Sequence, residues 1–365
     1  MKILLWSGYQ NPYWNKSTWD NKGIGGSEYC VLKLAEYFAK EGHNVIVSGD
    51  VVDGKFNDVQ YLHYGKFLEW RGPVGHTNPN ALKMFSHFDV VISTNYIHYM
   101  RHLKDSHITF DKSYFWMHNE DYYKWYKGDS LTNIDECFQS PKLNKILGVS
   151  KFHEKLLVDN SESLFNYGIS DALDKIYHVE NAIDVNDYTN PLDNKIKGRI
   201  IWSSAPNRGL DFIVQNWEKW KEQRPDLSLV VCLPPYTTDW DKADVSNLED
   251  VEYKGALNPT QLREEQSKAE YWIYVSNYIE TYCITALEMM LQKVKIITNG
   301  PGNIKNLIEN GGRGILIDDI DPDIVIEQLL NKYDNKMIEN SYEYALEQSW
   351  ENRTMEWLNL IEDEE

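Results

Sequence analysis

Short apolar runs alternate along the chain with longer stretches in which apolar residues recur every three or four positions. The short runs have the length and composition of buried parallel strands, and the longer stretches have the period of amphipathic helices. Strands are expected in the first half at residues 3–6, 44–48, 89–93, 114–118 and 145–150, and in the second half at 199–203, 228–232, 251–257, 271–276, 294–298 and 315–317. This alternation predicts βαβ units and an α/β fold with parallel sheets.

The length of 365 residues favours two domains of ordinary size. The segment 187–197 is polar and contains Pro191, so we expect the boundary near it. A final amphipathic helix is predicted to begin at Ser349.

Composition narrows the functional class. The formal net charge of −19 argues against a nucleic-acid partner and against general adsorption to an anionic membrane surface. The basic residues Lys142, Lys145, Lys151 and Lys155 are interpreted as a solvated face, so membrane contact is not indicated. The four scattered cysteines predict reduced thiols, and no apolar run reaches spanning length. A cytoplasmic protein is expected. The abundance of Asn, Lys, Ile and Tyr is typical of an AT-rich genome, which a virus or a microbe can have.

The stretch from Glu280 to Glu288 carries the strongest candidate chemistry. Glu280 lies in the loop after the strand at 271–276, and Glu288 lies about one turn inside the following helix. In an open α/β sheet, ligands bind outside the carboxyl ends of the strands, and the free N–H groups of a helix N-terminus there attract phosphate. Carboxylates accept hydrogen bonds from sugar hydroxyls, so the pattern indicates a nucleotide-sugar site. The alternative is that the two glutamates belong to a helix cap and a helix surface.

The spacing of these glutamates and their surroundings resemble the retaining family-4 glycosyltransferases of the GT-B fold. The resemblance covers nearly the whole chain. It implies two Rossmann-like parallel-sheet domains that face a cleft, with a C-terminal helix that crosses back to the first domain. The expected division is an acceptor domain at 1–184, a nucleotide-sugar donor domain at 185–348, and a crossover helix at 349–365.

A glycine-rich loop precedes the first predicted helix. Gly23-x-Gly25-Gly26 lies more than fifteen residues after the first strand, too late for a dinucleotide fingerprint, in which the first glycine follows the strand directly. Gly25 and Gly26 instead resemble the family loop in which the absence of a Cβ lets the backbone approach the donor diphosphate and the acceptor. The alternative is a flexible loop at a helix start.

Two side chains match family positions at the ends of strands. His118 ends the strand at 114–118, where the family has a histidine that contacts the donor sugar near the reacting carbon, although Asn119 replaces the usual aspartate. Arg208 stands at a predicted helix start, where the helix dipole disfavours a cation unless an anion is bound. It matches a lysine that binds the donor phosphates in the family, and Ser204 stands where the family has a further arginine.

The remaining candidates also come from the resemblance. Main-chain groups between Lys254 and Leu257 are expected to meet the nucleobase. Tyr282, Cys283 and Ile284 replace the family's Phe-Gly-Leu, and an isolated cysteine at a helix N-terminus can have a lowered pKa. Asp321 before Pro322 is interpreted as a helix cap rather than as part of an Asp-x-Asp metal site.

These observations predict a glycosyltransferase that moves a sugar from a nucleotide-sugar to an acceptor hydroxyl, with retention and without a bound metal. No cofactor is expected besides the donor. The expected catalytic residues are His118 and Glu280, and the expected donor-binding residues are Gly25, Gly26, Ser204, Arg208, Lys254, Leu257, Tyr282, Cys283, Ile284, Thr285 and Glu288. The alternatives are a GT-B nucleotide-sugar epimerase, a dinucleotide oxidoreductase, and a non-catalytic relative that binds a sugar nucleotide.

Overall fold

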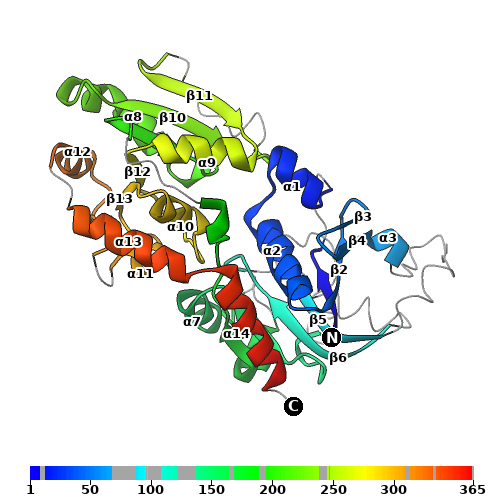
Figure 1. Cartoon of the computed structure of the whole chain (residues 1–365). Coiled ribbons are helices and arrows are strands. Elements are labelled where there is room, and N and C mark those ends of the chain that lie inside the picture. Colours follow the sequence, from blue (N-terminus) through cyan, green and yellow to red (C-terminus); the bar gives the residue numbers. More distant parts are fainter. Residues whose placement is uncertain are drawn as a thin grey trace. The chain divides into compact units, whose positions relative to one another are not determined.

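The chain folds into two compact units, which we describe one at a time from a computed structural model (Figure 1). The structure describes residues 1–8, 13–67, 87–95, 97, 108–121, 137–163, 168–188, 195–237, 245, 247–309, 312–331 and 334–363. Unit 1 comprises Met1–Ser17, Gly26–Asn181 and Arg353–Glu365, and unit 2 comprises Thr18–Gly25 and Ala182–Asn352.

Unit 1 is built on an eight-stranded sheet in the order β3-β4-β2-β1-β5-β6-β7-β8. All neighbouring strands are parallel except β3 and β4, which pair antiparallel. The strands are β1 (Lys2–Trp6), β2 (Asn44–Gly49), β3 (Gly54–Phe56), β4 (Val59–His63), β5 (His87–Thr94), β6 (Thr109–Trp116), β7 (Lys145–Gly148) and β8 (Ile176–His178). The predicted strands of the first half are therefore confirmed.

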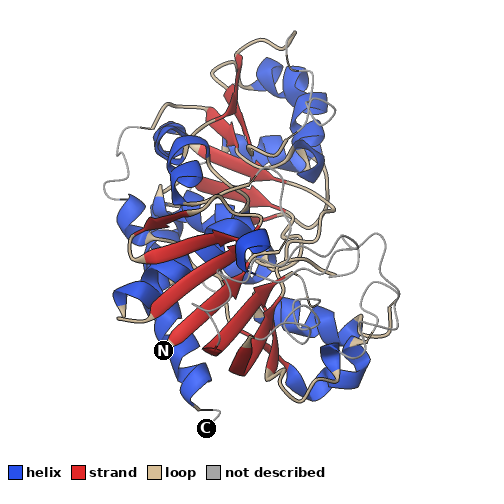
Figure 2. Cartoon of the chain, turned by 90° about the vertical axis from the view of Figure 1, so that its right-hand side faces the viewer, coloured by secondary structure: helices blue, strands red, loops and turns tan. Residues whose placement is uncertain are grey.

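Helices flank the strands of this sheet, as Figure 2 shows. Those of unit 1 include α2 (Gly26–Lys40), α3 (Tyr64–Phe67) and α7 (Lys151–Asp159). Helix α2 buries Val31, Leu34 and Phe38, the face that its apolar period predicts. Gly42 then takes a left-handed backbone (φ +86°), which stops the helix as expected.

Unit 2 is built on a six-stranded parallel sheet in the order β11-β10-β9-β12-β13-β14. Its strands are β9 (Arg199–Trp202), β10 (Ser228–Leu233), β11 (Val251–Ala256), β12 (Tyr271–Tyr274), β13 (Lys295–Thr298) and β14 (Ile315–Leu316). Its helices include α8 (Leu210–Gln223), α9 (Pro259–Lys268), α10 (Ile284–Leu291), α11 (Ile304–Glu309), α12 (Pro322–Leu330) and α13 (Asn335–Glu347). Asp321 caps α12 by accepting the N–H of Asp323, so the interpretation of this residue as a cap is confirmed.

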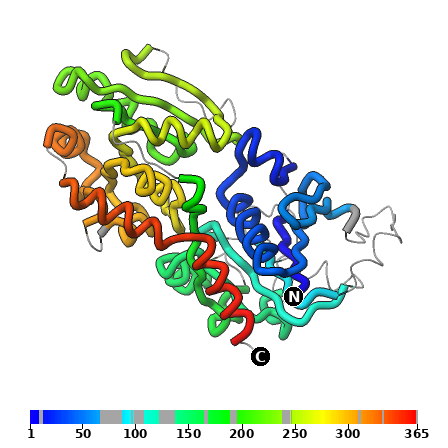
Figure 3. The backbone as a smooth tube through the Cα atoms, viewed as in Figure 1, coloured from blue at the N-terminus to red at the C-terminus, as the bar shows by residue number. Residues whose placement is uncertain are grey.

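The last helix, α14 (Trp350–Glu362), returns the chain to unit 1. It begins where Ile183 and Ser349 pair in a parallel bridge. Its distal part packs on β6: the ring of Trp357 meets that of Trp116 edge-on at 5.2 Å, and Lys112 Nζ donates to the carbonyl oxygen of Ile361 at 2.6 Å. The path of the chain can be followed as a tube in Figure 3.

The structure also contains elements that the hydrophobic pattern does not predict. The loop expected between Ser7 and Gly25 contains helix α1 (Lys16–Lys22), which buries none of its own side chains and so has no apolar period. Strands β3 and β4 form a hairpin whose turn residues, Asn57 and Asp58, have positive φ angles of 47° and 62°. The pattern likewise does not predict helix α13.

Both units have large aromatic cores. Tryptophans that are less than 2% exposed include Trp6, Trp14, Trp116, Trp202, Trp217, Trp220, Trp272, Trp350 and Trp357. The four cysteines are buried and free. Among the residues that the structure describes, none of the helices combines the length and the hydropathy that a membrane span requires.

Candidate active site

The predicted chemistry of unit 2 gathers at the carboxyl ends of β9 and β12, which are adjacent parallel strands. Ser204 is the second residue after β9, and Arg208 ends the short 3-10 helix Pro206–Arg208. Glu280 lies in the loop after β12, and α10 begins at Ile284. The parallel sheet therefore places the expected arginine, carboxylate and helix N-terminus at one edge of the unit.

Gly209 permits the close approach of the two loops. It has φ +121°, and a Cβ at this position would lie 2.5 Å from the carbonyl oxygen of Val275 at the end of β12. Glycine is required here for both the backbone conformation and the space. The chain can therefore turn into α8 directly against β12, with Arg208 facing the Glu280 loop.

Arg208 is held by two neighbours from that loop. Its Nη1–H donates to Glu280 Oε1 at 3.1 Å, and its Nη2–H donates to the hydroxyl oxygen of Tyr278 at 3.4 Å. The guanidinium carbon also lies 4.4 Å from the centre of the Tyr278 ring. Burial lowers the pKa of Arg208, but the Glu280 carboxylate and the nearby tyrosines together outweigh burial, and the net pKa is raised. Arg208 is therefore a fixed positive charge.

Glu280 is only 6% exposed and is fixed through both its side chain and its backbone. Its carboxylate accepts the hydroxyl of Tyr274, whose pKa is raised by burial and then by this negative charge. Its carbonyl oxygen accepts the N–H of Asn303 at 2.8 Å. Gly302 packs against the same peptide: a Cβ there would lie 2.3 Å from Glu280 O. The turn after β13 thus presses on the Glu280 loop and fixes the carboxylate.

The N-terminus of α10 has an unusual backbone. Cys283 precedes the helix with φ 78° and ψ 77°, a left-handed conformation that a side chain disfavours. Glycine, which the family has at this position, adopts this conformation without strain. The suggestion of a lowered cysteine pKa is wrong: burial, and then the charge of Glu280, raise the pKa of the Cys283 thiol well above its ordinary value. Cys283 is therefore a neutral thiol in a strained turn.

The strained backbone at Cys283 predicts that the glycine variant is more stable than the alanine variant, the reverse of the order in a helix interior. We expect Cys283→Gly to be about 1 kcal/mol more stable to unfolding than Cys283→Ala, because glycine adopts positive φ without the Cβ clash. The same two substitutions at Cys30, which is buried inside α2, should show the opposite order by about 1 kcal/mol. Urea unfolding of the four variants measures both differences, and an alanine variant that is the more stable one at both sites would contradict the strain.

Glu288 projects from the second turn of α10 and is partly buried. Gln266 Nε2–H donates to Glu288 Oε2 at 2.8 Å, and the Tyr188 side chain also bonds to this carboxylate. Burial raises the pKa of Glu288 despite these bonds. The predicted ribose acceptor is therefore hydrogen-bonded to side chains from α9 and from the segment at Tyr188.

The segment expected to meet a nucleobase contains a β-bulge. Val231 pairs with Tyr253 and Cys232 with Gly255, so Lys254 is the extra residue of edge strand β11. Its ammonium contacts Glu252 at 3.0 Å and Glu265 at 3.2 Å. These bonds hold the side chain, while the main chain continues to Leu257, the part that the resemblance assigns to base recognition.

The glycine loop is divided between the two units. Gly25 ends the part that belongs to unit 2, and Gly26 is the first residue of α2 in unit 1. A Cβ on Gly26 would have no neighbour within 4 Å. Gly23, with φ +77°, packs against the carbonyl oxygen of Leu257 at 3.7 Å from its ideal Cβ position. The segment 18–25 therefore lies against the loop after β11.

His118 lies two residues past the end of β6 in unit 1. Its backbone N–H donates to Asn95 Oδ1 at 2.8 Å, and its ring lies 4.4 Å from that of Trp116. Burial, reinforced by nearby His153, lowers the pKa of His118 to about 3. Its imidazole is therefore neutral at physiological pH and can exchange hydrogen bonds, but it cannot act as a cationic acid.

His153 supports the His118 loop and was missed by the sequence analysis. The Val149 N–H donates to its Nδ1 at 3.1 Å, so the proton is on Nε2, which donates to the carbonyl oxygen of Asn119 at 2.9 Å. The only sequence signal is its place in the first turn of α7, after the Ser150 cap. Burial lowers its pKa to about 4.

The lowered pKa of His153 makes unit 1 acid-sensitive. In the unfolded chain, His153 binds a proton near pH 6.5, whereas in the folded chain it binds one only near pH 4. The free energy of unfolding therefore falls as the pH falls through this window. Between pH 6.5 and 5 we expect His153 to remove about 1.5 kcal/mol of unfolding free energy. Denaturant unfolding should show this pH dependence reduced by that amount in His153→Asn, which keeps an acceptor for Val149.

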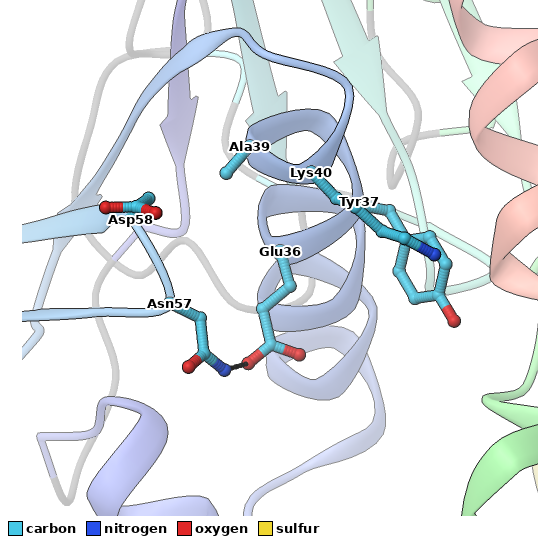
Figure 4. A pocket seen from close by; sticks show the side chains of 6 residues that line it. All are labelled: Glu36, Tyr37, Ala39, Lys40, Asn57 and Asp58. Carbon is cyan, nitrogen blue, oxygen red and sulfur yellow. Dashed lines mark hydrogen bonds between the residues drawn. The ribbon is translucent and has the colours of Figure 1, made fainter.

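A hollow of about 360 Å³ lies on unit 1 between α2 and the β3–β4 turn. Its lining comprises Glu36, Tyr37, Ala39, Lys40, Asn57 and Asp58. Figure 4 shows the Asn57 amide, which donates to Glu36 Oε1 at 2.8 Å across it. None of the predicted site residues lines this hollow, so it is not a candidate for the donor site.

Comparison with known proteins agrees with this architecture. Residues 201–348 match the sequence model of the family described as Glycosyl transferases group 1. Similar solved structures include HepE of Anabaena in complex with UDP and glucose (TM-score 0.68, 13% identity, 99% of each chain covered) and sucrose-phosphate synthase of Thermosynechococcus elongatus (0.68, 14%, 99% of this chain and 98% of that chain). A glycosyltransferase of Rickettsia africae has a TM-score of 0.67 at 16% identity, over 99% and 98% of the two chains. No curated protein sequence matches the chain.

The strand order and the structural comparisons define the fold class of the chain. The two parallel-sheet units are those of the GT-B fold, as the sequence resemblance predicts. Residues 201–348, which form most of unit 2, match the sequence model of the family Glycosyl transferases group 1.

Proposed function

We propose that the protein is a glycosyltransferase that moves a sugar from a nucleotide-sugar to an acceptor hydroxyl. The observation that carries the proposal is the arrangement of Arg208, Glu280 and the N-terminus of α10 at the carboxyl ends of β9 and β12. The family match of this segment supports the same class of reaction. Among proteins of this fold, HepE has been solved with UDP-glucose and a starch synthase with ADP and acarbose.

Unit 2 is proposed to bind the donor diphosphate. The Ala286 N–H bonds to Cys283 O, so the first helical N–H groups at Ile284 and Thr285 are the ones directed to a phosphate. Arg208 adds a fixed positive charge beside them, with N–H groups beyond the two that contact Glu280 and Tyr278. Positive charge at this place stabilises the leaving diphosphate as the glycosidic bond breaks.

The other predicted residues have distinct proposed roles. Glu288 accepts hydrogen bonds from the ribose, and main-chain groups from Lys254 to Leu257 contact the base. Glu280 and the neutral imidazole of His118 position the sugar, and Gly25 and Gly26 admit substrate to the backbone. Ser204 and Tyr282 line the phosphate region.

We further propose that transfer proceeds with retention and without a metal ion. The positive charge near the leaving group comes from Arg208 and the α10 dipole. The oxygen of the departing phosphate is proposed to accept the acceptor's proton, since no carboxylate of the sequence matches a general base for it. The acceptor is a hydroxyl compound, a glycan being the expected class.

Tyr278 is expected to tune donor binding through Arg208. Tyr278→Ala removes both the ring face and the hydroxyl acceptor, so we expect the donor KM to rise about 10-fold with little change in folding. Tyr278→Phe keeps the ring and should raise it about twofold. The matched control is Tyr342→Ala, which removes a ring beneath Lys293, at 4.8 Å, outside the proposed site. Equal KM values for the wild type and Tyr278→Ala would show that Tyr278 does not affect donor binding.

The function itself is tested by following the fate of the donor. The protein is incubated with UDP-, GDP-, ADP- and TDP-sugars, with and without an oligosaccharide mixture, and products are analysed by mass spectrometry and by NMR of the anomeric carbon. Two results together support the proposal: a nucleoside diphosphate is released only when acceptor is present, and the transferred sugar keeps the anomeric configuration that it had in the donor. Isomerised nucleotide-sugar without acceptor indicates an epimerase. Donor binding without any turnover indicates a non-catalytic relative, which the strained Cys283 favours.

A further inference from the structure

A cluster of three metal-ligating side chains lies on unit 1, outside the proposed catalytic chemistry. His87 and Asp89 are two residues apart on β5, and Asp111 lies on the neighbouring strand β6. One ligand atom from each lies within 4.8 Å of the others. Side chains two residues apart on a strand share a face, so two paired strands present all three to the same point.

The distances fit a single divalent ion of zinc type. His87 Nε2 lies 3.2 Å from Asp111 Oδ2 and 3.9 Å from Asp89 Oδ1. Two ligands each about 2.1 Å from a tetrahedral zinc ion are about 3.4 Å apart. Small rotations of the exposed carboxylates would complete such a site, and water would supply the remaining coordination.

Neighbouring groups orient two of the ligands. His87 Nδ1 lies 2.9 Å from Thr109 Oγ1, so a proton on Nδ1 can be donated to Thr109 while the Nε2 lone pair faces the carboxylates. The backbone N–H of Lys2 donates to Asp89 Oδ2 at 2.5 Å, and this leaves Oδ1 directed to the cluster. Zinc coordinates imidazole nitrogen together with carboxylate oxygen, whereas magnesium prefers oxygen alone.

We propose that His87, Asp89 and Asp111 bind a divalent transition-metal ion such as Zn²⁺. The ion joins β5 to β6 near their amino ends. Asp111 is about 17 Å along β6 from Trp116, after which His118 follows, so the site is structural rather than catalytic. Its competitor is a proton on His87, which would bridge the same carboxylates. Lys2 is a second competing cation, because the charge of Asp89 acts on its ammonium.

The experiment is calorimetric titration of the full chain with ZnCl₂ at pH 7.5, after treatment with a chelator and dialysis. We expect one zinc equivalent whose affinity falls at least 10-fold in His87→Gln and in Asp111→Asn. Thr109→Val, which keeps the strand shape, should weaken binding about 10-fold. His178→Gln is the matched control, because His178 contacts the single carboxylate of Glu154. The cysteines are buried, which limits competing sites.

The outcomes separate a built site from adventitious binding. Zinc should also raise the melting temperature of the wild type and not that of His87→Gln, because a ligand that binds only the folded state stabilises it. Circular dichroism confirms that each variant is folded. Equal zinc affinity in the wild type and His87→Gln, or no zinc binding by the wild type, would overturn the proposal.

Discussion

Arg208→Ala is expected to lower kcat/KM for the donor by about 10²- to 10³-fold, the largest effect of any single substitution considered. The guanidinium is the charged side chain that the β9 loop brings beside the N-terminus of α10, and it is partly buried and bonded to Glu280 and Tyr278. Its removal takes away the charge that stabilises the departing diphosphate. Steady-state release of nucleoside diphosphate measures the change. Lys219→Ala, an exposed cation of α8, serves as the control.

A loss of folding must be separated from a loss of catalysis in this variant. Arg208→Ala leaves the Glu280 carboxylate buried without its cation, which is expected to cost roughly 3 kcal/mol of unfolding free energy. The double variant Arg208→Ala/Glu280→Gln removes that charge and should regain most of the stability, but none of the activity. If the double variant were active, or if Arg208→Ala alone kept wild-type turnover, Arg208 would have no role in the transfer.

Gly302→Ala is expected to combine a large loss of stability with a loss of activity. Gly302 has φ +63°, and a Cβ would lie 2.3 Å from the carbonyl oxygen and 2.7 Å from the nitrogen of Glu280. The backbone conformation alone costs about 1 kcal/mol, and the contact with a rigid peptide adds to it, so we expect about 3 kcal/mol in total. The displaced Glu280 would misplace the sugar, and a shift of about 1 Å can cost about 10²-fold in rate.

Gly312→Ala is the matched control for this steric argument. Gly312 has the same φ of +63°, but a Cβ there has no neighbour within 4 Å. We therefore expect only the backbone cost of about 1 kcal/mol and normal turnover. Denaturant unfolding and donor turnover are measured on both variants. Similar losses in the two would show that backbone strain, rather than the contact with Glu280, limits the Gly302 position.

The positions of the main elements were predictable because local patterns determine them. The apolar run at Tyr271–Tyr274 and the three-to-four-residue spacing after Cys283 place Glu280 in a loop and Glu288 inside α10, as the structure has them. Asp321 and Pro322 likewise identify their own cap. Helix α1 could not be found in this way, because its side chains meet no core and leave no period. The roles assigned to the site residues remain predictions.

The contacts that organise the site depend on long-range packing and were not predictable. Arg208 and Glu280 are 72 residues apart and meet only because β9 and β12 are neighbours in the sheet. Gly302 contacts Glu280 from the turn after β13, and the sequence around Gly302 does not predict this contact. His153 carries a weak signal, its place after the Ser150 cap, but the Asn119 carbonyl that it holds lies 34 residues away. Sequence patterns identify these side chains without identifying their partners.

The central claim is that unit 2 binds the nucleoside diphosphate of a sugar donor at α10, with Glu288 on the ribose. The most direct test is a thermal-unfolding panel of UDP, GDP, ADP and TDP on the wild type, on Glu288→Ala, and on Glu264→Ala, a largely exposed glutamate of α9. At about 100 times its Kd, a ligand should add about 2.7 kcal/mol of stability. We predict that one nucleotide stabilises the wild type and Glu264→Ala alike, and Glu288→Ala much less. Stabilisation by none of the four, or equal stabilisation of all three proteins, would contradict the claim.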